Sequence, residues 1–77
     1  MIEKPLHFGI RADQWGEQGL IIHPDGHVYL EDIDRKDGGG GTYNMGTWHE
    51  FSAKHLDSTE AVYQEVALYI KEHIAVG

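Results

Sequence analysis

Apolar residues recur at helical spacing toward the C-terminal end of the chain. They fall three or four positions apart and would form one stripe, made of Val62, Val66, Tyr69, Ile70 and Ile74. Asp57 precedes the stripe, and Glu60 follows Asp57 three residues later. This order is typical of a capping box. The pattern predicts a C-terminal α-helix over about residues 58–75 with one apolar face.

A different period marks the first half of the chain. Leu6, Phe8 and Ile10 alternate with less apolar residues, as in a strand with one buried face. Residues 19–33 contain two apolar runs separated by Pro24-Asp25-Gly26. Proline presets φ, aspartate bonds back to the backbone and glycine accepts a left-handed conformation, so this order predicts a β-hairpin with a tight turn.

The segments between these elements are richer in glycine. Residues 12–19 interrupt the alternation and are expected to form a loop, in which Trp15 either covers the sheet edge or contacts a partner; the covering role is favoured. Residues 34–41 end in four glycines and are expected to be a mobile loop. Residues 42–51 have the composition of a last strand.

Together these elements predict an α+β fold in a single domain, residues 1–77. We expect a three- to four-stranded antiparallel meander packed on one face by a single C-terminal helix, about residues 58–75. The opposite face of the sheet would be open to solvent or to a partner. We expect this outer face to be aromatic, with Tyr29, Tyr43 and Trp48.

The composition limits how the core can be stabilised and where in the cell the protein is expected. The chain has no cysteine, so no disulfide or thiolate metal site can reinforce the small core that 77 residues allow. No apolar run approaches the roughly 20 residues needed to span a bilayer, and the start of the chain lacks the features of a signal peptide. We expect a soluble cytoplasmic protein.

Acidic residues are concentrated in one part of the chain. The formal charge is −7, and no lysine or arginine stands between Arg11 and Arg35, where six acids fall. Direct binding to nucleic acid requires a basic surface and is therefore not expected. A basic protein surface is the better match. The residues predicted to bind such a partner are Asp13, Trp15, Glu17, Asp25, Tyr29, Glu31, Asp32, Asp34 and Asp37.

Metal binding, phosphate binding and catalysis have less support in the sequence. His23 and His27 flank the hairpin turn and could supply half of a zinc or nickel site, but the other ligands have no counterpart in the sequence, so exposed histidines are favoured and no cofactor is expected. Residues 32–43 do not fit a calcium loop, and the four glycines stand in no phosphate-binding context. With no nucleophile motif and no thiol, the chain is not expected to be an enzyme.

In size, charge and sheet-plus-helix layout, the chain resembles the small acidic proteins encoded by phages, among them anti-CRISPR proteins. That resemblance implies a stoichiometric inhibitor that binds a basic nucleic-acid groove on a host defence protein such as a Cas subunit, in the bacterial cytoplasm. Two alternatives stay open: a small metal-responsive module that uses His23 and His27, and a homodimer that pairs sheet edges or outer faces.

Overall fold

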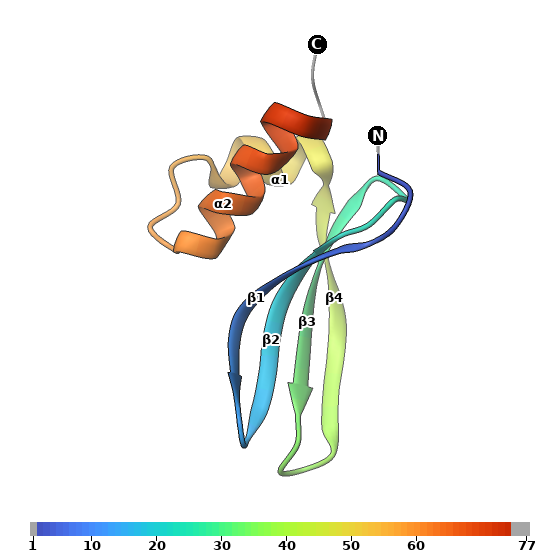
Figure 1. Ribbon diagram of the computed structural model, residues 1–77, viewed down its shortest axis with the longest axis vertical. Helices are drawn as coiled ribbons and strands as arrows, with labels where there is room; N and C mark the ends of the chain where they lie inside the picture. The colour runs from blue at the N-terminus through green and yellow to red at the C-terminus, as the bar shows by residue number, and fades with distance from the viewer. Residues whose placement is uncertain (1, 75–77) are drawn as a thin grey trace.

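The computed structural model describes residues 2–74, and its sheet is a four-stranded antiparallel meander (Figure 1). Each strand pairs with its neighbour in sequence, in the order β1-β2-β3-β4. The strands are β1 (Leu6–Asp13), β2 (Gly16–Ile22), β3 (His27–Asp34) and β4 (Gly39–Thr47). The expected antiparallel α+β architecture is confirmed.

The expectation of a single helix is wrong, because a second helix follows β4 directly. This helix, α1 (Trp48–His55), begins where the last strand was expected to continue. The Thr47 side chain accepts a hydrogen bond from the Glu50 backbone N–H, and the Glu50 side chain accepts one from the Thr47 backbone N–H. This reciprocal capping box ends the strand and starts the helix.

The C-terminal helix starts later than expected. It runs over α2 (Ala61–Tyr69) and continues as a π-helical turn, Ile70–Ile74; the expected residue 75 lies outside the described residues. Its N-cap is Glu60, which makes no side-chain capping hydrogen bond, so the capping box predicted for Asp57 and Glu60 does not form.

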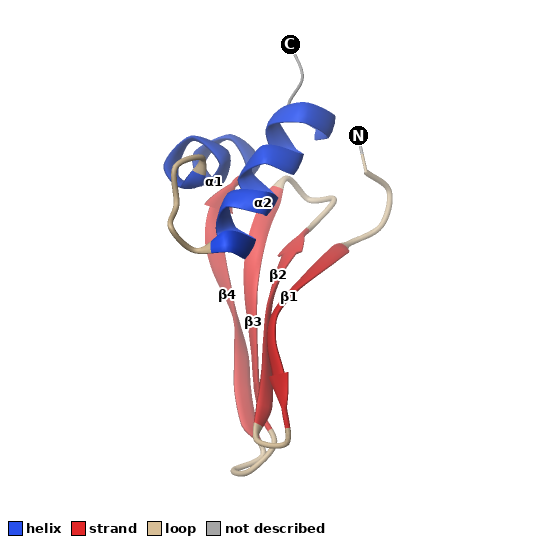
Figure 2. Ribbon diagram, turned by 60° about the vertical axis from the view of Figure 1, so that its left-hand side comes forward, coloured by secondary structure: helices blue, strands red, loops and turns tan. Residues whose placement is uncertain are grey.

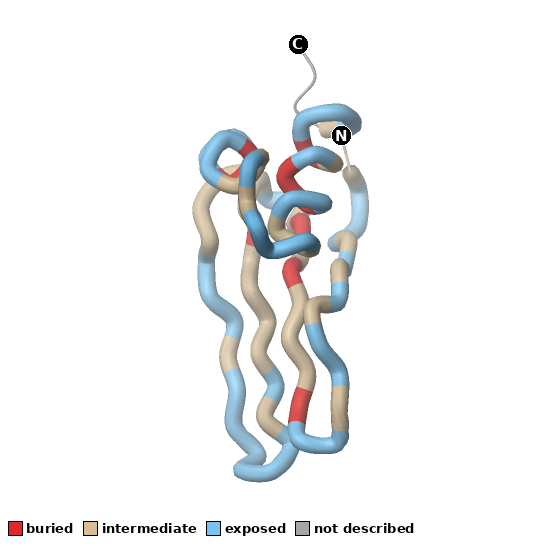
Figure 3. The backbone as a smooth tube through the Cα atoms, turned by 90° about the vertical axis from the view of Figure 1, so that its left-hand side faces the viewer, coloured by how far each residue is buried: buried red, intermediate tan, exposed pale blue. Residues whose placement is uncertain are grey.

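The two helices lie on one face of the sheet and at one end of it (Figure 2). The strands extend well beyond them, which gives an elongated molecule of 43 × 27 × 15 Å. We call residues 9–19 and 31–42 the bare half, because no described helix lies on either face there (Figures 1 and 2). The remaining described residues form the covered half, and buried residues concentrate there (Figure 3).

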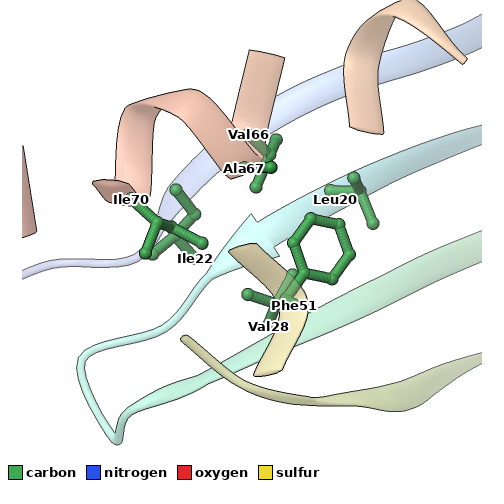
Figure 4. Close-up of a cluster of buried hydrophobic side chains, with 7 residues drawn as sticks. All are labelled: Leu20, Ile22, Val28, Phe51, Val66, Ala67 and Ile70. Atoms are coloured by element: carbon green, nitrogen blue, oxygen red, sulfur yellow. The ribbon is translucent and has the colours of Figure 1, made fainter. Parts of the chain in front are cut away.

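The hydrophobic core lies between the helices and the covered half of the sheet (Figure 4). Its members come from β2, β3, α1, α2 and the π-helical turn, and all have no exposed surface: Leu20, Ile22, Val28, Phe51, Val66, Ala67 and Ile70. Leu6, Phe8 and Ile10 pack against this cluster, as their alternation predicted. The Ser52 hydroxyl donates to the Ala67 carbonyl oxygen at 2.9 Å, which joins the two helices inside the core.

The predicted hairpin and its turn are confirmed. The Gly26 N–H donates to the His23 carbonyl oxygen at 3.1 Å, and Gly26 has φ +95°. This is the left-handed glycine that the Pro-Asp-Gly order anticipates.

Much of the two expected loops is strand instead, although residues 35–38 form a turn within the second of them. Residues 12–19 form the ends of β1 and β2 with a two-residue turn, Gln14 and Trp15, between them. The last three glycines of the expected mobile loop belong to β4 and pair with β3. A Cβ on Gly40 would lie 2.3 Å from the Asp32 carbonyl oxygen, and Gly40 has φ +143°. Glycine is therefore needed here for a close strand approach rather than for mobility.

Candidate interaction surface

The face of the sheet turned away from the helices is left uncovered by the described elements (Figure 2). Residues directly opposite each other on paired strands share a face, so the register identifies its members. Three cross-strand rows make up this outer face: His7, Ile21, Tyr29 and Asn44; Gly9, Gly19, Glu31 and Thr42; Ala12, Glu17, Ile33 and Gly40.

A groove crosses the outer face at the middle row. Gly9 and Gly19 stand opposite each other on β1 and β2, so this part of the face carries no side chain. The resulting hollow has a volume of about 260 Å³, and most residues that line it belong to the outer face. A Cβ on Gly9 would meet no atom within 4 Å. The outer groove, defined by His7, Gly9, Glu17, Gly19, Ile21 and Glu31, could receive one side chain of a partner.

Glu31 is the acidic residue best placed for this groove. Glu31 belongs to β3 and stands directly opposite Gly19 of β2, so its side chain lies beside the hollow. Among the described residues its carboxylate has no hydrogen bond or ion pair within the chain. An unpaired carboxylate beside an open hollow favours a cationic group of a partner.

Three of the predicted partner-binding acids stabilise turns instead. The Asp13 carboxylate accepts from the backbone N–H groups of Trp15 and Gly16 at 2.9 and 3.0 Å. The Asp34 carboxylate accepts from those of Lys36 and Asp37 at 3.0 and 3.2 Å.

Asp25 has the same role at the third turn, where it accepts from the His27 backbone N–H at 2.9 Å. Each of the three hairpin turns thus has its own aspartate, which gives these predicted partner-binding residues a structural role within the chain.

Two basic residues neutralise acids at the far end of the bare half. Arg11 pairs with Asp13 at 2.8 Å, and Arg35 pairs with Glu17. The Arg11 hydrogen bond, followed by the two turn N–H groups, holds the pKa of Asp13 below its usual value. The acids that sequence placed in one run are therefore partly compensated in space.

Trp15 lies at this same end and is 59% exposed, so the favoured expectation that it covers the sheet edge is wrong. Its carbonyl oxygen accepts from the Arg35 backbone N–H at 2.9 Å, which ties the β1–β2 turn to the end of β3. The ring itself stays available as a contact residue, the other role considered for it.

The remaining acids do not form one patch. Glu31 lies on the outer face, and Asp32, its neighbour in β3, points to the opposite face with Gln18 and Gly41. Asp37 lies in the β3–β4 turn and is exposed. A flat partner could contact Glu31 or Asp32, but not both.

A polar cluster surrounds the β2–β3 turn. The Tyr29 hydroxyl donates to the second Asp25 carboxylate oxygen at 2.6 Å, which lowers the pKa of Asp25 and raises that of Tyr29. The Nδ1 atoms of His23 and His27 lie 3.4 and 3.5 Å from the other Asp25 oxygen. Tyr29 thus lies on the outer face, as predicted, but its hydroxyl is engaged within the chain.

In the part of the chain that the structure describes, no group of three or more side chains of the metal-ligating types His, Cys, Asp and Glu is placed to hold one ion. The His23 Nδ1 atom accepts from the Asp25 backbone N–H at 3.2 Å, so that nitrogen already has a partner.

The expectation of an aromatic outer face is wrong for two of its three residues, Tyr43 and Trp48. Tyr43 stands opposite Leu30 and therefore shares the face that the helices cover, although it is 54% exposed. Trp48 is the first residue of α1, packs against the core and donates its indole N–H to the His23 carbonyl oxygen at 3.0 Å. Three residues of the outer face were not expected there from the sequence, namely Gly9, Gly19 and Ile33. The Ile33 side chain is 37% exposed.

Comparisons with protein-family models, with curated proteins and with solved structures give no match for this chain. Among residues 2–74, no helix has both the length and the apolar character needed to cross a membrane.

Proposed function

We propose that this is a non-enzymatic protein-binding module whose outer groove receives a cationic side chain from a partner. The observation that supports this most is the position of Glu31, whose carboxylate has no ion pair among the described residues and lies directly beside the Gly9–Gly19 hollow on an uncovered sheet face. The net charge of −7 adds long-range attraction toward a basic surface.

The residues around Glu31 fit this role. Ile21 and Ala12 provide apolar contact for the methylene groups of a lysine or arginine, whose charged head would reach Glu31. Ile33 extends the apolar surface beyond the groove on the same face. Apolar contacts around a charged anchor are the usual composition of a protein interface.

The narrower form of the proposal is an inhibitor of the anti-CRISPR type. The partner surface would then be a nucleic-acid-binding groove on a Cas or other host defence protein in the bacterial cytoplasm. Its support is the size, the acidity and the layout of the chain. Such an inhibitor would compete with nucleic acid for the captured partner.

The test is capture of a partner from bacterial lysate at low and high salt, with two variants of the groove. Gly9→Tyr places a ring in the hollow at a position where a Cβ would meet no atom within 4 Å, and Glu31→Lys reverses the charge beside it. We expect both to lose a partner that the wild type captures at low salt and loses at high salt. Unchanged melting temperatures would show that the fold is intact.

Two matched controls lie outside the groove. Gly39→Tyr adds the same ring at a glycine that also has open space around it, and Asp37→Lys makes the same change of charge in the β3–β4 turn. Both should retain the partner. A lane without partner at both salts, or equal loss in all four variants, would contradict the role of the groove.

A further inference from the structure

The two edge strands of the sheet differ in how they are protected. The free edge of β1 follows Pro5, has an irregular register between Gly9 and Arg11, and ends in the charged residues Arg11 and Asp13. Proline, bulges and charges on an edge strand all oppose pairing with another strand. β4, the opposite edge, has none of these within residues 39–44 and carries no charged residue along its whole length.

An exposed aromatic ring marks this unprotected edge. Phe8, Leu20, Leu30 and Tyr43 form one cross-strand row, which begins beside the core and ends at β4. Leu20 is fully buried, whereas Tyr43 is 54% exposed. The row is therefore incomplete on the β4 side, and another strand placed there would cover the ring.

We propose that β4 pairs in antiparallel fashion with β4 of a second copy of this chain, about a two-fold axis at Tyr43. A two-fold interface uses the same patch on both chains, so it requires an edge that is compatible with itself. The uncharged segment 39–44 meets that requirement, because two chains of charge −7 could meet there without placing like charges opposite each other.

The protected β1 edge determines where the assembly ends. After two β4 strands have paired, both outer edges of the joined sheet are β1 strands, with their irregular register and their charges. The result is a closed dimer with eight strands in one sheet rather than an open fibre. The bulge at Met45 and Gly46, where Gly46 has φ +103°, limits pairing to the segment before it.

A second copy fits this edge better than a basic partner does. No carboxylate stands on β4 to attract cations, and Glu31, the free acid of the outer groove, belongs to the next strand. Pairing at the edge leaves the outer groove open, so self-association and the proposed function can be tested separately.

The experiment is light scattering on the purified chain over a concentration series. We expect the mass to rise from 8.7 kDa to twice that value. Tyr43→Lys should weaken association by at least about fivefold, because two cations would face each other across the new strand pair. Ala12→Lys, the same charge on the β1 edge, should leave association unchanged. A single-chain mass up to millimolar concentration, or equal effects of both lysines, would overturn the proposal.

A second measurement does not depend on the strength of association. Because the chain has no cysteine, Tyr43→Cys introduces a single thiol at the residue that faces its own copy across the proposed axis. Mild oxidation should join two chains rapidly through this position, and Ala12→Cys should react far more slowly. Equal rates for the two variants would also overturn the proposal.

Discussion

The covered and bare halves belong to one sheet but are stabilised in different ways. Every fully buried hydrophobic side chain among the described residues lies in the covered half. In the bare half, strand pairing, two turn aspartates and two ion pairs hold the chain instead. Burial of apolar side chains therefore stabilises the covered half, whereas the bare half depends on hydrogen bonds and ion pairs and keeps both faces of its sheet uncovered by helices.

The largest effect expected from this comparison concerns aromatic residues. Phe51 is fully buried between the sheet and α2, so Phe51→Ala should cost about 3–5 kcal/mol, a large part of the total stability of a small domain. Trp15→Ala, in the bare half, where the ring is 59% exposed, should cost about 0.5 kcal/mol or less. Denaturant unfolding would measure both. Similar costs would show that the halves are not distinct in packing.

The next effect separates two acids of the same turn. Asp34→Ala removes the acceptor for two backbone N–H groups and should cost about 1 kcal/mol. Asp37→Ala should change the free energy of unfolding by less than about 0.5 kcal/mol, because no hydrogen bond or ion pair to its side chain occurs among the described residues. Chemical denaturation of both variants is the measurement. Equal costs would mean that Asp34 has no special role in the turn.

The smallest expected effects concern the pH dependence of stability, and the two halves should contribute to it in different pH ranges. Burial beside Phe51 and Tyr63, followed by the charge of Lys54, lowers the pKa of His55 from 6.5. The unfolded chain therefore takes up this proton first, and stability should begin to fall as pH drops through 6.5. The pKa of Asp13 is lowered from 3.8, so its contribution is present above that value and is lost as pH falls through it.

Melting temperatures recorded from neutral to strongly acidic pH would resolve these two steps. His55→Gln should remove the step near neutrality and keep the acidic one, whereas Asp13→Asn should make the acidic step shallower. A pH profile that neither variant alters would contradict both assignments.

The sequence predicted those features that depend on neighbouring residues. The Pro24-Asp25-Gly26 turn contains its own chemistry, and the apolar stripe of α2 needs only helical periodicity. The capping box of Thr47 and Glu50 was also local, but the β-rich composition before it suggested that the strand continued. The glycines of residues 12–19 suggested a loop because a two-residue turn and a close strand pair both use glycine.

The interaction surface was harder to predict because it depends on register. Opposed glycines make a groove only when two strands align Gly9 with Gly19, and nothing in the local sequence specifies that alignment. The roles of the acids likewise depend on geometry, since Asp34 and Asp37 look alike in sequence and differ only in what their carboxylates contact. Of the nine residues predicted to bind a partner, Glu31 has the position that best fits the proposed groove.

Because each strand pairs with its neighbour in sequence, the order of the strands also has a consequence for how the chain folds. The β2–β3 turn lies at the end of the sheet where the core forms, whereas the turns that flank it lie at the opposite end (Figure 1). Pairing that starts at residues 24–26 would therefore gain the burial of Ile22 and Val28 early, before the rest of the two strands closes. Amide hydrogens should then exchange slowest beside that turn and progressively faster toward Trp15, so that the sheet opens from its far end while the core stays folded.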